Sequence, residues 1–130
     1  MQVVEGKGLE KLAGQLYEER SRKGLGDFPL TNRILGYWDK SDTEVDLVAV
    51  NETDRRLRFG SCKRSPGKLI ADINNFKGHI SRFLETFREY QDWQIEHVAI
   101  APRLDKSHHR ILTQHNIIPQ DLVDLTTGLE

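Results

Sequence analysis

Cysteine is nearly absent from this sequence, because Cys62 is the single one in 130 residues. A lone cysteine excludes an internal disulfide, and it favours a reducing compartment such as the cytoplasm. The sequence also lacks an apolar run of about 20 residues, the length that a membrane-spanning helix requires. We therefore expect a cytoplasmic protein without a membrane partner.

An excess of charge of either sign is lacking too. The 19 basic and 20 acidic residues leave a formal net charge of −1. Such a balance gives the whole molecule no attraction to nucleic acid, so any contact of that kind must be local. The phosphate-binding pattern G-x-x-x-x-G-K-[ST] is absent as well, and we therefore expect no ATP site in this chain.

The length and the 37% hydrophobic content suit one domain over residues 1–130 with a sizeable core. Five histidines raise the question of zinc, above all His108, His109 and His115. Neighbouring helical residues point about 100° apart, and no second cysteine completes a tetrahedral ligand set. We interpret these histidines as surface residues.

Hydrophobic periodicity predicts the element order α-β-β-β-α-β-α-β. The expected helices cover residues 8–22, 69–87 and 105–115, and the expected strands cover residues 34–38, 44–50, 56–63, 97–101 and 117–125. Three consecutive strands joined by polar turns favour an antiparallel meander. The fold class is therefore α/β, with a mixed central sheet flanked by helices.

The long second helix carries an apolar stripe in alternating four-residue and three-residue steps. Its members are Leu69, Ile73, Phe76, Ile80, Phe83 and Phe87. A stripe of this kind also suits a coiled-coil seam, but over about three heptads inside a mixed domain it favours a helix packed on a sheet.

Two of the expected strands carry polar residues on one face. Alternation along a strand places Asp46 on the same side as Glu44, and Ser61 on the same side as Lys63. If these strands pair, the acids meet the lysine. Cys62 then points to the opposite face, where a thiol packs as a small buried hydrophobic group and has no catalytic role.

This combination suits the hydrolysis of a phosphodiester. Carboxylates hold Mg²⁺, which activates water and stabilises the developing negative charge. A neighbouring lysine orients the water or offsets charge in the transition state. Asp46 fits the first role and Lys63 the second.

On these residues the chain resembles the PD-(D/E)xK nuclease-like superfamily. The family's first-helix glutamate falls on Glu10, its aspartate on Asp46, and its (D/E)-x-K tripeptide on Ser61-Cys62-Lys63. The resemblance covers most of the chain and implies a restriction-endonuclease-like core. It also implies a catalytic set of Asp46, Lys63, Glu10 and Ser61, with Mg²⁺ or Mn²⁺ held by Asp46 and Glu10. Glu44, on the same strand face as Asp46, is a further expected metal ligand.

The chain departs from this pattern at Ser61, where the family has a carboxylate. A hydroxyl removes one negative charge and is a weak ligand for a hard divalent ion, so metal affinity should fall sharply. We expect metal-dependent cleavage to be weakened or lost, which makes a pseudo-nuclease one alternative. Glu44 and Glu10 are the acids that would compensate.

More narrowly, the chain is similar to a nuclease-like domain of unknown function that lies C-terminal to archaeal-type P-loop ATPases. The similarity rests on Gly36-Tyr37-Trp38, on Glu44-Val45-Asp46-Leu47-Val48-Ala49 and on Gly60-Ser61-Cys62-Lys63. It implies that residues 1–130 form the C-terminal part of a longer ATPase, or a domain that meets its ATPase in trans.

A basic segment follows the same strands and contains no acidic residue. We expect it to contact nucleic acid through local charge, although an exposed basic turn and strand face would have the same sequence. The residues concerned are Arg55, Arg56, Arg58, Arg64 and Lys68. The alternative function is a non-catalytic scaffold that binds its ATPase, or a second copy, through the 69–87 helix or the edge of the meander.

Overall fold

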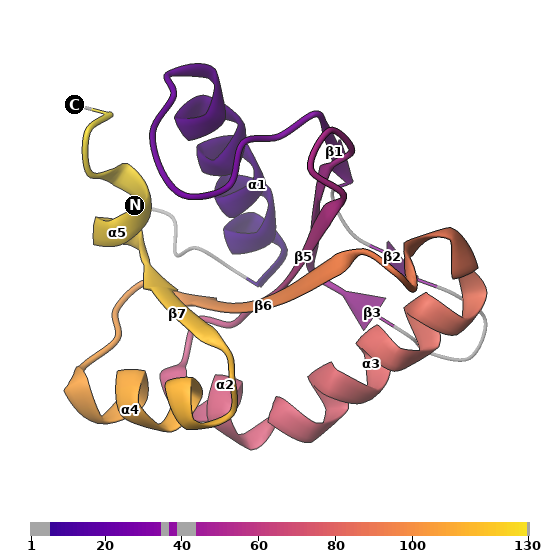
Figure 1. Ribbon diagram of the computed structural model, residues 1–130. Helices are drawn as coiled ribbons and strands as arrows, with labels where there is room; N and C mark the ends of the chain where they lie inside the picture. The colour runs from indigo at the N-terminus through magenta and orange to yellow at the C-terminus, as the bar shows by residue number, and fades with distance from the viewer. Residues whose placement is uncertain (1–5, 35–36, 39–43, 130) are drawn as a thin grey trace.

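The computed structural model describes residues 6–34, 37–38 and 44–129 (Figure 1). The helices are α1 (Gly6–Arg22), α2 (Pro66–Ala71), α3 (Ile73–Thr86), α4 (Lys106–Gln114) and α5 (Leu122–Thr126), with one 3₁₀ turn, η1 (Arg88–Tyr90). The strands are β1 (Asn32–Ile34), β2 (Tyr37–Trp38), β3 (Glu44–Val45), β4 (Leu47–Asn51), β5 (Arg56–Cys62), β6 (Gln94–Ala101) and β7 (Ile118–Asp121).

The main sheet has five strands in the order β1-β4-β5-β6-β7. The pairs β1–β4 and β4–β5 are antiparallel, which confirms the expected meander, whereas β5–β6 and β6–β7 are parallel. Parallel neighbours require crossover connections. Here α2 and α3 connect β5 to β6, and α4 connects β6 to β7.

Helices cover both faces of this sheet (Figure 1). In this view α1 and α5 lie above the sheet, and α2, α3 and α4 lie below it. The sheet separates two apolar clusters, one with Leu9, Ala13 and Tyr17 of α1, and the other with Phe76 and neighbouring residues of α3. The α/β class with a mixed, helix-flanked sheet is thus confirmed, while the restriction-endonuclease-like arrangement stays a prediction.

The apolar stripe of the expected second helix packs on the sheet. Leu69, Ile73, Phe76, Ile80 and Phe83 are all buried in the cluster below the sheet, and the partly buried Phe87 packs against it. The coiled-coil alternative is wrong for this stripe, because the face that a partner helix would need is already covered.

Four expected elements differ in detail. The expected strand at 34–38 is divided, because Ile34 ends β1 of the main sheet and Tyr37–Trp38 form β2 of a separate sheet. The second helix is broken at Asp72, which has φ −97° and ψ 4° and separates α2 from α3. The expected strand at 44–50 is divided, because Glu44–Val45 pairs with β2 in a separate two-stranded sheet. The final segment continues from β7 into a short helix, whose first turn is capped by Asp121 and Asp124.

Within the part of the chain that the structure describes, no helix combines the length and the apolar character needed to cross a bilayer.

Candidate functional site

The candidate site lies where two strands separate. Leu47 is opposite Gly60 in the β4–β5 ladder, and one residue earlier the chain bends so that Val45 pairs with β2 instead. At this bend the backbone N–H of Cys62 donates a 2.8 Å hydrogen bond to Oδ2 of Asp46. A buried carboxylate thus takes the place of a ladder partner at the end of β5, and it holds Asp46 there.

Asp46, Ser61 and Lys63 line one small pocket of about 30 Å³. The structure therefore brings together the three residues that strand alternation predicts. Asp46 and Ser61 are each only 5% exposed. Among the described residues, Ser61 Oγ has no protein hydrogen-bond partner. A buried hydroxyl of this kind calls for a water or a ligand, and the pocket has room for one.

The opposite wall of this pocket comes from the helical layer. Asp72, Phe76 and His79 line it, at the i, i+4 and i+7 spacing that places residues on one helix face. Asp72 lies at the break between α2 and α3 and accepts a 3.0 Å hydrogen bond from Nδ2 of Asn75. Sequence reasoning missed Asp72 and His79, although both are polar positions at the border of the apolar stripe.

A second, wider pocket of about 600 Å³ adjoins the first through Lys63, which lines both. Its lining residues are Glu10, Cys62, Lys63, Arg64, Ser65, Lys68 and Pro102. Glu10 of α1 thus reaches the end of β5, as expected, and lines this wider pocket, whereas Asp46 lines the smaller one. That Glu10 and Asp46 hold one metal ion together stays a prediction.

The structure describes only part of the predicted donor set for Mg²⁺. The structure describes the backbone of Glu44 but not its side chain, so that predicted ligand lies outside the described residues. Across the residues that are described, no three His, Cys, Asp or Glu side chains cluster so as to hold a metal ion. Asp46 supplies one carboxylate, and Ser61 beside it supplies only a neutral hydroxyl, which is a poor ligand for Mg²⁺.

Cys62 packs among the apolar residues beneath α1 and is 1% exposed. Burial raises the pKa of its thiol well above the ordinary value, and the negative charges of Asp46 and Glu10 raise it further. A thiol of this kind is not a nucleophile at neutral pH. Cys62 thus faces away from Ser61, as predicted, although Cys62 and Lys63 both line the wide pocket.

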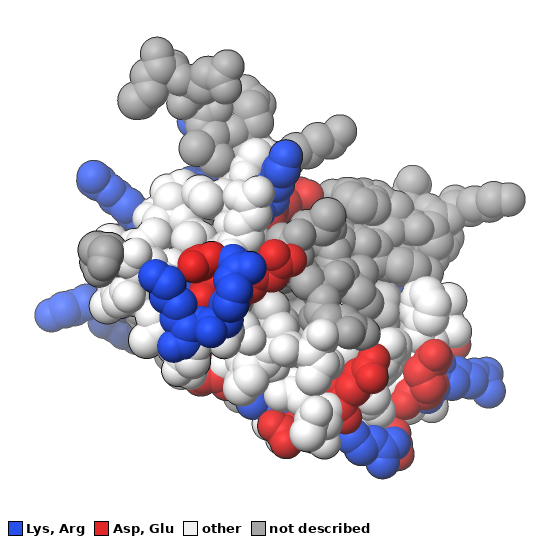
Figure 2. Space-filling model, turned by 90° about the horizontal axis from the view of Figure 1, so that it is seen from above, with Lys and Arg blue, Asp and Glu red and all other residues white. Residues whose placement is uncertain are grey.

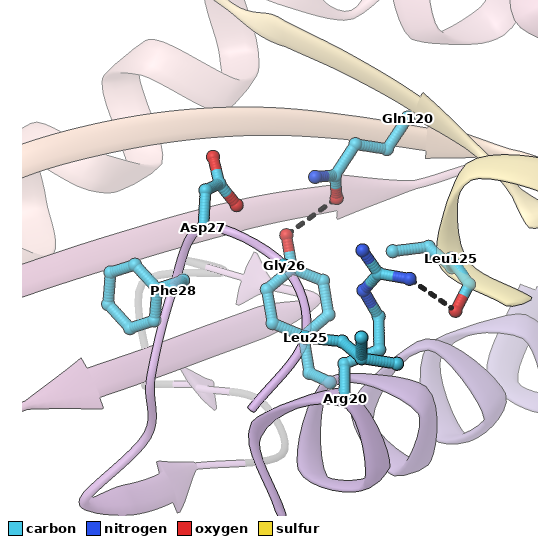
Figure 3. Close-up of a pocket in the computed structure, with 8 residues that line it drawn as sticks. Arg20, Leu25, Gly26, Asp27, Phe28, Gln120 and Leu125 are labelled. Atoms are coloured by element: carbon cyan, nitrogen blue, oxygen red, sulfur yellow. Dashed lines mark hydrogen bonds between the residues drawn. The ribbon is translucent and has the colours of Figure 1, made fainter. Parts of the chain in front are cut away.

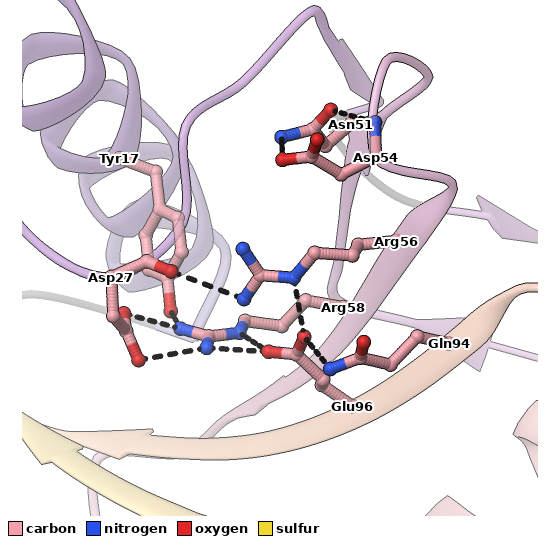
Figure 4. Close-up of polar contacts among 8 residues, drawn as sticks. All are labelled: Tyr17, Asp27, Asn51, Asp54, Arg56, Arg58, Gln94 and Glu96. Atoms are coloured by element: carbon pink, nitrogen blue, oxygen red, sulfur yellow. Dashed lines mark hydrogen bonds and ion pairs between the residues drawn. The ribbon is translucent and has the colours of Figure 1, made fainter.

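Arg58 belongs to a buried polar network at the opposite end of β5 (Figure 4). Its guanidinium binds both carboxylate oxygens of Asp27 at 3.0 and 2.9 Å, Oε1 of Glu96 at 2.6 Å, and the hydroxyl of Tyr17 at 3.2 Å. Burial alone would lower the pKa of Arg58, but the hydrogen bond with Asp27 and the other partners raise it above its ordinary value. The expectation that Arg58 contacts phosphate is wrong, because a side chain that is 1% exposed offers no donor to a ligand.

The two neighbouring arginines are also engaged. Arg56 donates to Oε2 of Glu96 at 2.8 Å and lies over the ring of Phe28 at 4.7 Å. Arg55 pairs with Asp92 at 3.1 Å on the surface. On the face that Figure 2 shows, Lys and Arg side chains lie beside Asp and Glu side chains and do not form one basic area. The predicted basic segment is therefore divided between the two ends of β5.

A smaller pocket of about 10 Å³ lies beside this network, between α1 and the C-terminal elements (Figure 3). The guanidinium of Arg20 donates to the backbone oxygens of Leu125 and Thr127, at 3.4 and 2.9 Å. The Tyr17 hydroxyl donates to Oε1 of Gln120 at 2.6 Å. These contacts attach α1 to β7 and α5, and the space between them is too small for a ligand.

Two of the three clustered histidines lie in α4. His108 forms a capping box with Asp105, in which each side chain binds the other residue's backbone N–H. His109 is half-buried and His115 is exposed. The interpretation as surface histidines agrees with this arrangement.

Comparisons of the chain with protein-family models, with curated proteins and with solved structures gave no match.

Proposed function

We propose that this chain is a nuclease-like domain with a restriction-endonuclease-like core, in which metal-dependent phosphodiester cleavage is weakened or lost. The observation that carries the proposal is the meeting of Asp46, Ser61 and Lys63 in one pocket at the point where β4 and β5 separate. The mixed sheet, with α1 on one face and α3 on the other, supports it.

Each residue contributes a definite part to this site. The N–H of Cys62 fixes one oxygen of Asp46, which orients the carboxylate. Lys63 lines both pockets and is placed to attract a phosphate oxygen. Ser61 contributes no charge, and the site therefore has one carboxylate fewer than a nuclease of this kind needs to hold Mg²⁺.

The domain would act in the cytoplasm beside a P-loop ATPase, either in the same chain or as a separate partner. Its own sequence contains no phosphate-binding glycine loop, so ATP hydrolysis would have to come from elsewhere. This association rests on the sequence resemblance and not on a surface of the structure.

Cleavage assays on restored and disabled variants test the proposal. The wild type, Ser61→Glu, and the double variant Ser61→Glu/Lys63→Ala are incubated with labelled single-stranded DNA, duplex DNA and RNA in Mg²⁺ and in Mn²⁺. We expect little or no cleavage by the wild type, clear cleavage by Ser61→Glu, and its loss in the double variant. Circular dichroism and thermal melting show whether each variant is folded.

A silent Ser61→Glu variant that remains folded and still fails to bind Mn²⁺ would contradict the proposal. That result would favour the alternative, a non-catalytic scaffold. The 69–87 stripe is buried against the sheet, so a scaffold would have to bind its partner through another surface.

A further inference from the structure

The basic side chains of this domain fall into two groups. Arg55, Arg56 and Arg58, near the start of β5, all form ion pairs. Lys63, Arg64 and Lys68 follow the end of β5, and none of them forms an ion pair within the described ranges. Positive charge at the end of β5 is thus left without a partner, whereas at its start it is neutralised.

The three unpaired cations line the same wide pocket. Arg64 is the second residue after β5, and Lys68 lies four residues later in α2, so that both reach the pocket from one short stretch of chain. Both are exposed, and Lys63 is half-buried between this pocket and that of Asp46. Of the lining residues that the structure describes, Glu10 is the only acidic one, so this part of the lining carries an excess of positive charge.

A hydroxyl lies among these cations. Ser65 lines the pocket, and although it is the residue before α2, its side chain makes no capping hydrogen bond. Its Oγ therefore remains available as a donor to an anion. Arginine, lysine and hydroxyl groups are the side chains that most often contact phosphate oxygens of nucleic acids.

We propose that this pocket binds the phosphodiester backbone of a nucleic acid strand through Arg64, Lys68 and Lys63. The inference rests on the proposed function, and it places the bound strand at the end of β5 and not along Arg55–Arg58. The pocket is open, and Lys63 lines both it and the pocket of Asp46 and Ser61. This arrangement suits a nucleic acid strand that lies in the wide pocket and passes the candidate site at Asp46.

The salt dependence of binding tests this assignment. Affinities of the full chain for labelled DNA and RNA strands of about 20 nucleotides are measured by fluorescence anisotropy between about 50 and about 300 mM NaCl. We expect Arg64→Gln/Lys68→Gln to reduce the slope of log K against log salt by about 1.4 to 1.8, because each lost phosphate contact removes about 0.7 to 0.9.

The matched control is Arg55→Gln/Arg88→Gln. It removes the same total charge from two exposed residues that do not line the pocket, and we expect the slope of log K against log salt to stay that of the wild type. Equal effects of the two double variants would overturn the inference, because charge alone would then explain binding. An unchanged slope in Arg64→Gln/Lys68→Gln would overturn it as well.

A second arm separates a strand from a free phosphate. Inorganic phosphate is titrated against the bound strand at constant ionic strength, and we expect no displacement beyond that of chloride. Binding of inorganic phosphate that depends on Arg64 and Lys68, without binding of a strand, would overturn the inference.

The two proposals fail separately. Cleavage by Ser61→Glu with binding that ignores Arg64 and Lys68 would overturn this inference and leave the proposed function intact. Binding that depends on Arg64 and Lys68, together with a folded Ser61→Glu variant that neither cleaves nor binds Mn²⁺, would overturn the proposed function and leave this inference intact.

Discussion

Oδ2 of Asp46 accepts a 2.8 Å hydrogen bond from the backbone N–H of Cys62, although both residues lie beyond the last β4–β5 pair, Leu47–Gly60. This contact closes the end of the β4–β5 ladder with a side chain. Asp46 therefore has a structural role beside any role in binding, and the two roles predict different responses to substitution.

Replacement of Asp46 by alanine leaves the buried N–H of Cys62 without its partner. An unsatisfied buried donor costs about 1 to 3 kcal/mol, and we expect Asp46→Ala to reduce the free energy of unfolding by that amount in urea titrations. Asp46→Asn keeps an oxygen acceptor, and its loss should be smaller. Equal losses in the two variants would show that the hydrogen bond contributes nothing.

Arg58 is the centre of the most buried charge network in the described part of the chain. Glu96, its partner, is 11% exposed, and removal of one member of a buried ion pair costs about 3 to 5 kcal/mol. We expect Arg58→Ala to lower the free energy of unfolding by about 3 kcal/mol, the low end of this range, because Arg56 still pairs with Glu96. Urea denaturation measures this loss.

Arg55→Ala is the control for Arg58→Ala. Both partners of the Arg55–Asp92 pair are exposed, and pairs of this kind contribute about 0 to 1 kcal/mol. A similar loss in the two variants would refute the contrast between the buried network and the surface pair.

The same network predicts how stability depends on pH. Burial would raise the pKa of Glu96, but hydrogen bonds from Arg56 and Arg58 outweigh it and lower the pKa below the ordinary 4.5. The hydrogen bond from Arg58 likewise lowers the pKa of Asp27 below 3.8. A carboxyl group with a lowered folded pKa stabilises the fold above its unfolded pKa, and this stability is lost as the pH falls through the folded pKa.

The difference in unfolding free energy between the wild type and Glu96→Gln should therefore be largest above about pH 5 and shrink towards about pH 3. Measurements of urea unfolding across this range test the sign. Burial also lowers the pKa of His97, but that residue is present in both proteins and its effect cancels. A constant difference would show that Glu96 is not charge-paired in solution.

Strand alternation predicted the core of the site well, and charge patterns predicted the rest poorly. Asp46, Ser61 and Lys63 were placed correctly because a period of two fixes which side chains share a face. Arg58 was misplaced because an arginine on a strand gives no sign of distant partners such as Asp27. Asp72 was missed because the apolar stripe keeps its spacing on both sides of it, from Leu69 to Ile73. Only the backbone angles of Asp72 show that the helix breaks there.

Gly60 gives a final test of how closely the strands approach beside the site. A Cβ at this position would lie 3.0 Å from Cβ of Leu47 and 3.3 Å from Cγ1 of Val98, whereas a Cβ at Gly78 on α3 would meet no atom within 4 Å. Overpacking of a core costs about 1 to 3 kcal/mol, and we expect that loss for Gly60→Ala. Gly78→Ala should instead stabilise the domain by about 0.5 to 1 kcal/mol, since alanine favours a helix interior.

Gly60 also precedes Ser61, so Gly60→Ala added to Ser61→Glu should cleave less than Ser61→Glu alone. Gly78→Ala added to Ser61→Glu should not reduce cleavage. Thermal melting and the cleavage assay measure the two effects, and a stable, fully active Gly60→Ala protein would show that the strand ends tolerate displacement.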